Sequence, residues 1–149
     1  HDIPFDPGLV VAGDWTPSSG FEATRALLDL PDPPTGIVCQ NDRMAVGTYE
    51  ALKEAGLRIP HDMSVVGYDD DDISRHLFPP LTTLVLPHRA MGQFVIEQHM
   101  EGRAAAGPRT KLECELVERD SVAPPRAAQA PPSGRDGEHG AAREPEFSS

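Results

Sequence analysis

Hydrogen-bonding side chains directly follow two short apolar runs of this chain. Asn41 comes just after the apolar run at 36–39, and Asp69 opens an acidic run at 69–72 after the apolar run at 64–68. An amide and an ionised carboxylate together offer donors and several acceptors, which match the adjacent hydroxyl groups of a sugar or ribose. The alternative is that Asn41 only caps a helix and the acidic run is a solvated loop, and the pattern leaves both interpretations open.

Trp15 is the single tryptophan of the chain, and it lies in a loop before a predicted helix. Its indole could stack on a ring or on a sugar face. Alternatively, it could pin the loop onto the core. The sequence alone does not decide between these roles.

The spacing of the residues does not match known metal-binding or catalytic motifs. The run at 69–72 lacks the glycine and closing glutamate of an EF-hand loop, and no histidine pair has the i, i+4 spacing of a metal-binding helix. The chain also has no nucleophile elbow, no phosphate-binding P-loop and no dinucleotide-binding glycine fingerprint. We therefore predict no metal, no cofactor and no enzymatic activity.

The predicted elements place the polar residues at the ends of parallel strands. Apolar periodicity predicts a helix over 19–30, and the continuous apolar run at 36–39 is typical of a strand buried on both faces. A helix over 42–55, capped at Asn41 and ended at Gly56, then leads to a second strand at 64–68. Strand, helix and strand form a βαβ unit, which requires a parallel sheet. Ligands bind beyond the carboxyl ends of such strands.

Further elements follow the acidic run. Two prolines precede an extended segment at 81–86, Pro87 opens a helix that ends at Gly102, and residues 111–119 alternate like an edge strand. The first thirteen residues could form a strand or a frayed end, and the sequence leaves this open. From residue 122 onward the composition shifts to Pro, Ala, Gly, Arg and Glu, which predicts a disordered tail over 122–149.

Composition excludes several classes of protein. The chain has 149 residues, 38% of them apolar, and a net charge of −11, which would repel the phosphate backbone of DNA. No apolar run approaches the roughly 18 residues of a membrane span, and no signal peptide is visible at residues 1–15. Cys39 and Cys114 lie in separate apolar stretches, so we expect buried free thiols and a cytoplasmic location.

Three sequence runs, at 36–47, 54–70 and 78–84, resemble the LacI/GalR family of transcriptional repressors in order and spacing. The similarity extends from about Gly13 to Val122 and includes the closing Leu-Val-x-Arg-x-Ser pattern at 116–121. The resemblance implies an α/β fold of the type I periplasmic-binding-protein-like class. In this fold a cleft separates two subdomains that are joined by crossing strands.

By this resemblance, residues 1–121 form an incomplete effector-binding and dimerisation domain. It would comprise the parallel-sheet C-terminal subdomain and a crossover helix at 87–102. Four residues match cleft positions of the family: Asn41 and Asp69 as hydrogen-bonding partners of the effector, Trp15 as an aromatic contact, and His88 as a lining side chain. The helix at 42–55 and the stretch at 74–77 would lie at a homodimer interface.

The resemblance also implies a function. A small effector, a sugar or sugar derivative, would control operator binding through an N-terminal helix-turn-helix that is not among these residues, and no membrane would be involved. One rival is a periplasmic sugar-binding protein of a transporter, which the expected free cysteines disfavour. A third possibility is an enzyme that uses Asp69 or His88 as an acid or base.

Overall fold

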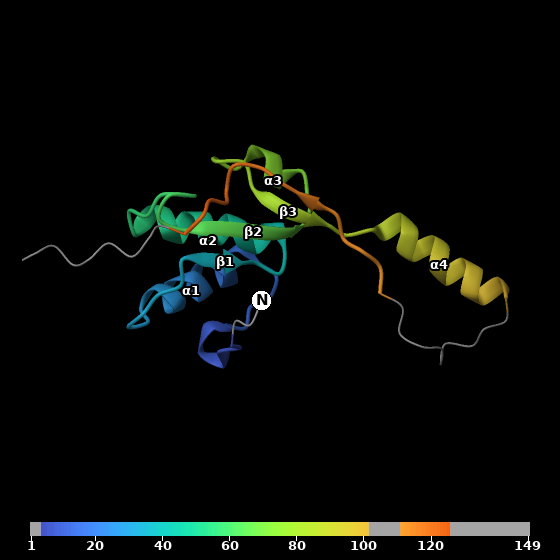
Figure 1. The fold of residues 1–149 in the computed structure, drawn as a ribbon, viewed down its shortest axis with the longest axis horizontal. Coiled ribbons are helices and arrows are strands. Elements are labelled where there is room, and N and C mark those ends of the chain that lie inside the picture. Colours follow the sequence, from blue (N-terminus) through green and yellow to red (C-terminus); the bar gives the residue numbers. More distant parts are fainter. Residues whose placement is uncertain (1–3, 102–110, 126–149) are drawn as a thin grey trace, which may run out of the picture.

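A computed structural model describes residues 4–101 and 111–125 of the chain (Figure 1). Helices and strands alternate over much of this length, as the sequence predicted. In chain order the elements are η1 (Pro7–Leu9), α1 (Pro17–Leu28), β1 (Gly36–Val38), α2 (Asp42–Glu54), β2 (Ser64–Asp69), α3 (Ile73–His76), β3 (Thr82–Val85), α4 (His88–Met100) and β4 (Leu116–Val117).

The four strands form one sheet in the order β1-β2-β3-β4. The first three strands are parallel, whereas β4 pairs antiparallel with β3 at the edge. Helix α2 connects β1 to β2, and α3 connects β2 to β3. The predicted α/β class and βαβ unit are thereby confirmed, and the carboxyl ends of the three parallel strands lie along one edge.

Side-chain caps determine where the first two long helices begin. Thr16 accepts a hydrogen bond from the Ser19 amide and Pro17 occupies the first turn, so α1 begins two residues earlier than the predicted 19–30 range. Asn41 caps α2 as predicted. Gly56, just beyond α2, has a φ of +70°, a conformation that glycine adopts without strain.

Small residues allow α1 and α2 to pack closely. A Cβ atom on Gly20 would overlap the Met44 backbone, and one on Gly47 would overlap the carbonyl of Pro17. The hydroxyl of Thr24 donates to that of Thr48 at 2.9 Å across this contact. The two helices therefore form one rigid layer, and α2 forms the connection to the sheet.

The core lies between this helical layer and one face of the sheet. Its buried apolar members are Leu27, Ile37, Cys39, Met44, Ala45, Tyr49, Leu52, Met63, Val65 and Leu81. The prediction that the strand at 36–39 is buried on both faces is wrong, because Val38 is 67% exposed. Among residues 4–101 and 111–125, only one face of β1 receives a helical cover, so only Ile37 is enclosed.

Helix α4 extends away from the sheet (Figure 1). It contains no buried residue, and its apolar side chains Val95, Ile96 and Met100 are 64%, 64% and 79% exposed. Pro87 is the N-terminal cap rather than the first helical residue. Its predicted end at Gly102 lies outside the described residues. The helix is therefore present as predicted, but its apolar face has no partner in the described part of the chain.

The two ends of the described chain differ from each other in packing. Near the start, η1 is a short 3-10 helix, so the undecided segment there is not a strand. Near the other end, Ala123 exchanges two hydrogen bonds of 3.1 Å with the Ser64 side chain. Most of the predicted tail, at 126–149, lies outside the described residues. None of the described helices is long and apolar enough to span a membrane.

Candidate functional site

Three of the predicted site residues follow the carboxyl ends of neighbouring parallel strands. Asn41 follows β1, Asp69 is the last residue of β2, and His88 follows β3 as the first residue of α4. Burial raises the pKa of Asp69, and the charge of His88 acts on the same carboxylate in the opposite direction. The structure therefore brings Asp69 and His88 close enough to interact electrostatically.

Asn41 connects the predicted aromatic residue to the start of α2. Its Oδ1 accepts a 2.7 Å hydrogen bond from the Met44 amide, and its Nδ2 donates at 3.2 Å to the carbonyl oxygen of Trp15. Asn41 is thus a helix cap, and one N–H of its carboxamide is not used by these two bonds. The Trp15 residue is 63% exposed, so the described part of the chain does not enclose its ring.

Asp69 stands at the start of a tight turn with an unusual backbone. Its φ is +111° and that of Asp70 is +52°, so two consecutive non-glycine residues lie in the left-handed region. Each such residue costs on the order of 1–3 kcal/mol and persists only where neighbouring contacts hold it. The contacts that hold this turn are therefore part of the site.

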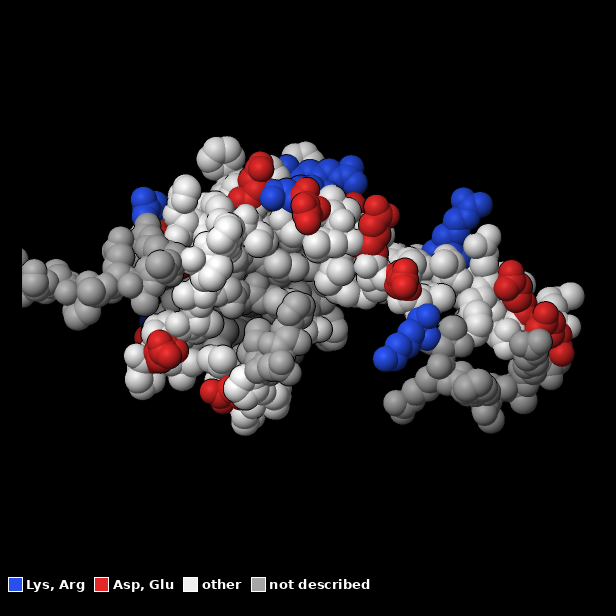
Figure 2. Space-filling view, viewed as in Figure 1, with Lys and Arg blue, Asp and Glu red and all other residues white. Residues whose placement is uncertain are grey.

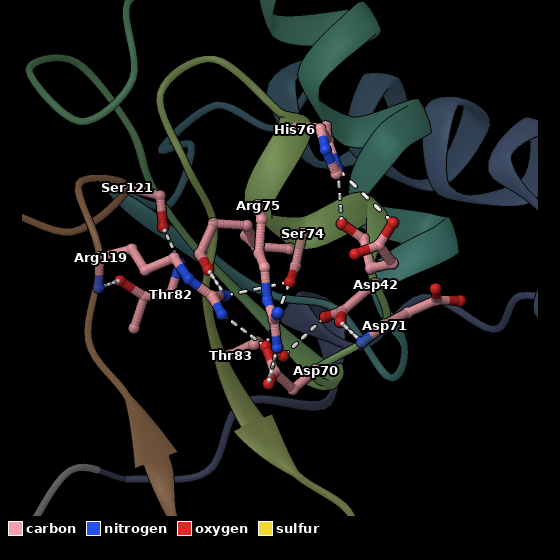
Figure 3. Close-up of polar contacts among 12 residues, drawn as sticks. Asp42, Asp70, Asp71, Ser74, Arg75, His76, Thr82, Thr83, Arg119 and Ser121 are labelled. Carbon is pink, nitrogen blue, oxygen red and sulfur yellow. Dashed lines mark hydrogen bonds and ion pairs between the residues drawn. The ribbon is translucent and has the colours of Figure 1, made fainter.

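One of these contacts comes from Asp42, a completely buried carboxylate in the first turn of α2 (Figure 3). Its Oδ1 accepts from the Thr83 hydroxyl at 2.6 Å, and its Oδ2 accepts from the Asp71 amide at 2.8 Å. Burial raises the pKa of Asp42, while the two hydrogen bonds act to lower it. A Cβ on Gly67 would overlap the Asp42 carboxylate, so glycine at this position of β2 leaves the necessary room.

Arg119 holds the turn from the opposite side (Figure 3). Its guanidinium donates at 2.5 Å to Asp70, at 2.7 Å to the carbonyl of Leu81 and at 3.0 Å to the buried hydroxyl of Ser74. The Arg119 hydrogen bond keeps the pKa of Asp70 below its ordinary value, and Arg75 adds to this effect. Figure 2 shows acidic and basic side chains gathered over α3. The acidic run is therefore not a purely solvated loop.

Ser121 fastens the closing segment to the sheet. Its hydroxyl donates at 2.6 Å to the Val65 carbonyl and accepts at 2.8 Å from the Thr82 amide. The Arg-x-Ser pattern thus supplies one side chain to the turn and one to the strands. Sequence reasoning assigned no site role to Asp42 or Arg119. For Asp42, the available signal was a second acidic side chain beside the cap residue at a buried helix start.

The two cysteines are free, as predicted. Cys39 is buried, and burial raises the pKa of its thiol to about 11. Cys114 is only half-buried, which differs from the expectation, and its Sγ lies 3.0 Å from the hydroxyl of Tyr68. Within residues 4–101 and 111–125, no group of three or more His, Cys, Asp or Glu side chains could hold a metal ion.

Comparison with known proteins agrees with this architecture. The sequence matches the family of periplasmic binding protein-like domains over residues 1–122. The chain belongs to this family. The resemblance to LacI/GalR repressors is confirmed by the relatives of the chain. They include the HTH-type transcriptional repressor CytR of Escherichia coli K12, 36% identical over 80% of this chain, and the lactose operon repressor of the same strain, 39% identical over 80%.

Solved structures give the same picture. The complex of the transcriptional regulator CelR with cellobiose has a TM-score of 0.68 at 34% identity, and covers 80% of this chain and 37% of that one. A lac repressor dimer bound to operator and the anti-inducer ONPF has a TM-score of 0.64 at 40% identity. The match covers 74% of this chain and 39% of the lac repressor chain. The chain spans 36% of CytR and 34% of the lactose operon repressor, about a third of each.

Proposed function

We propose that this chain is the effector-sensing part of a LacI-type transcriptional repressor and that its effector is a sugar or sugar derivative. The observation that carries the proposal is the placement of Asn41, Asp69 and His88 at one edge of the parallel sheet. Ligands of open α/β sheets bind at such an edge. The named relatives are transcriptional regulators rather than enzymes, which also supports the proposal.

Each residue of the proposed site has a distinct chemical role toward a sugar. The carboxylate of Asp69 would accept hydrogen bonds from adjacent hydroxyl groups, and the spare N–H of Asn41 would donate one. The exposed ring of Trp15 would cover an apolar face of the sugar ring. His88 would line the site beside Asp69. No cofactor and no catalytic step is needed for this function.

Effector binding would act on DNA by linkage. A sugar that binds one arrangement of the protein better than another shifts the population toward that arrangement, and the affinity for operator DNA changes with it. The DNA contact would come from a helix-turn-helix outside these residues, since this chain is acidic. Action on DNA and the free thiols together support a cytoplasmic location.

We also propose that the protein is a homodimer. Helix α2 and the segment after α3 border a hollow of about 690 Å³, and Phe78 on its rim is 94% exposed. An aromatic side chain so exposed beside a hollow with both apolar and charged lining is typical of a protein–protein contact. Dimeric forms of the lac repressor, to which this chain is similar, support the same assignment.

The test of the binding site is a calorimetric titration of the full-length protein with cellobiose, lactose and D-ribose. We expect at least one of these sugars to bind, and Asp69→Ala to weaken its binding at least tenfold, or about 1.4 kcal/mol. The side chain of Asp72 is 82% exposed in the same acidic run, so Asp72→Ala is the matched control and should bind like the wild type. Equal affinity of wild type and Asp69→Ala would remove Asp69 from the site.

A further inference from the structure

We propose that Asp42 is a positioning residue that holds Asp69 in its binding orientation. The proposal rests on the proposed function, in which Asp69 contacts the effector. Asp42 itself is completely buried, so it does not face the solvent from which an effector would enter. It acts instead on the backbone that follows Asp69.

The turn after β2 needs an external support. Asp69 and Asp70 both have positive φ values, and neither is a glycine. The hydrogen bond from the Asp71 amide to the Asp42 carboxylate, 2.8 Å long, lies directly beyond these two residues. Because β2 fixes the backbone before Asp69 and Asp42 fixes it at Asp71, the conformation between them is held at both ends.

The surroundings of Asp42 are shaped around its carboxylate. The other oxygen accepts from the Thr83 hydroxyl on β3, so both oxygens have partners. Gly67 on β2 leaves the space that the carboxylate occupies. An acidic side chain is also favoured in the first turn of a helix, where backbone N–H groups are unpaired. Side chains from β3 and the start of α2 thus place one oxygen under the turn.

The start of α2 also connects the loop that carries Trp15 to the turn that carries Asp69. Asn41 binds the carbonyl of Trp15, and its neighbour Asp42 binds the amide of Asp71. The spacing between the aromatic residue and the Asp69 carboxylate therefore depends on two adjacent side chains. Arg119 supports the same turn through the Asp70 side chain, whereas Asp42 holds the backbone itself.

The experiment compares Asp42→Ala, Asp42→Asn and Thr48→Val in the full-length protein. Cellobiose, lactose and D-ribose are the probes, and the exchange rate of the Asp71 amide is measured by NMR. We expect Asp42→Ala to speed Asp71 exchange and to weaken sugar binding at least tenfold. Asn is isosteric with Asp and can still accept from the Asp71 amide and donate to Thr83, so Asp42→Asn should restore both quantities.

Thr48→Val is the control for a general loss of stability. It removes the buried hydroxyl that lies within hydrogen-bonding distance of Thr24 and Cys39, away from the turn, and should leave Asp71 exchange and sugar affinity within twofold of the wild type. If Asp42→Ala retains wild-type affinity while Asp69→Ala loses binding, the positioning role is overturned and the proposed function stands.

The amide measurement separates the two proposals. If none of the three sugars binds the wild type, the proposed ligand class fails, while Asp71 exchange still tests the role of Asp42. If Asp42→Ala does not fold, the exchange rate of the Asp71 amide in the wild type tests the role of Asp42. An Asp71 amide that exchanges at the rate of an unstructured peptide overturns the proposal, and protection of at least tenfold supports it.

Discussion

Two arginine side chains hold the charge of Asp70. Arg119 and Arg75 both donate to its carboxylate, and the hydrogen bond from Arg119 is the main cause of its lowered pKa. A carboxyl group with a lower pKa in the folded than in the unfolded state stabilises the folded protein above the unfolded-state pKa. This contribution is lost as the pH falls through the folded-state pKa.

We therefore predict that Asp70→Asn lowers the free energy of unfolding at about pH 7 by roughly 1 kcal/mol and that this deficit shrinks below about pH 4. Urea unfolding of wild type and variant across this pH range measures the difference. Asp42 titrates in both proteins, and burial, which the substitution leaves in place, is the main cause of its raised pKa. A deficit that stays constant as the pH falls would show that the Asp70 charge is not the cause.

At the residue scale, the sequence predicted the side chains that follow strands and missed those that support them. Asn41 and Asp69 stand out because each lies within two residues of the end of an apolar run. The partners of the turn, Asp42 and Arg119, are 29 and 49 residues away from the residues that they hold, Asp71 and Asp70. Such pairings depend on sheet topology, which local spacing does not encode.

Among the elements, the crossing of α1 and α2 leaves the least room for change. A Cβ at Gly47 would overlap the Pro17 carbonyl and crowd the Phe21 amide, both of them backbone groups. Backbone atoms cannot turn aside as a flexible side chain can. The helices would have to separate, and the Thr24–Thr48 hydrogen bond between them would lengthen.

Gly47→Ala should accordingly destabilise the protein by roughly 1–3 kcal/mol, as overpacked core substitutions do. Chemical denaturation of the full-length protein measures this loss. Gly92→Ala in α4 is the matched control, since nothing lies within 4 Å of its Cβ position, and it should not destabilise the fold. Equal stability of both variants would mean that the helices do not pack at this distance.

The order and type of the main helices and strands followed from periodicity and from glycine and proline positions. Some boundaries differ from those predicted. Helix α1 begins at Pro17, two residues earlier than the apolar pattern predicted, because Thr16 caps it there. Helix α3 was missed, since four residues after an acidic run give too short a pattern to recognise. The edge strand β4 is only two residues long, much shorter than the predicted 111–119, and it pairs antiparallel with β3.

At the scale of the whole molecule, we predict that Phe78→Asp dissociates the dimer. A charge at this 94% exposed position would have to be desolvated in the interface, which should raise the dimer dissociation constant at least tenfold, or about 1.4 kcal/mol. Analytical ultracentrifugation of the full-length protein measures it. Phe5 is 80% exposed and does not line this hollow, so Phe5→Asp should remain dimeric. An unchanged constant for Phe78→Asp would place the interface elsewhere.

Exposed apolar surface explains why the isolated sequence could not predict every burial state. The sequence predicted core positions at Val38 in β1 and at the apolar side chains of α4. These side chains are exposed in the structure. Exposed apolar surfaces of this kind are typical of sites that contact another polypeptide segment.

The central claim is that sugar binding at the sheet edge controls DNA binding. The most direct measurement is the affinity of the full-length protein for a DNA site selected from random sequence, by fluorescence anisotropy, with and without a saturating sugar. We predict at least a tenfold change in the dissociation constant for the wild type and no change for Asp69→Ala. An affinity for DNA that is the same with the sugar bound and without it would contradict the account.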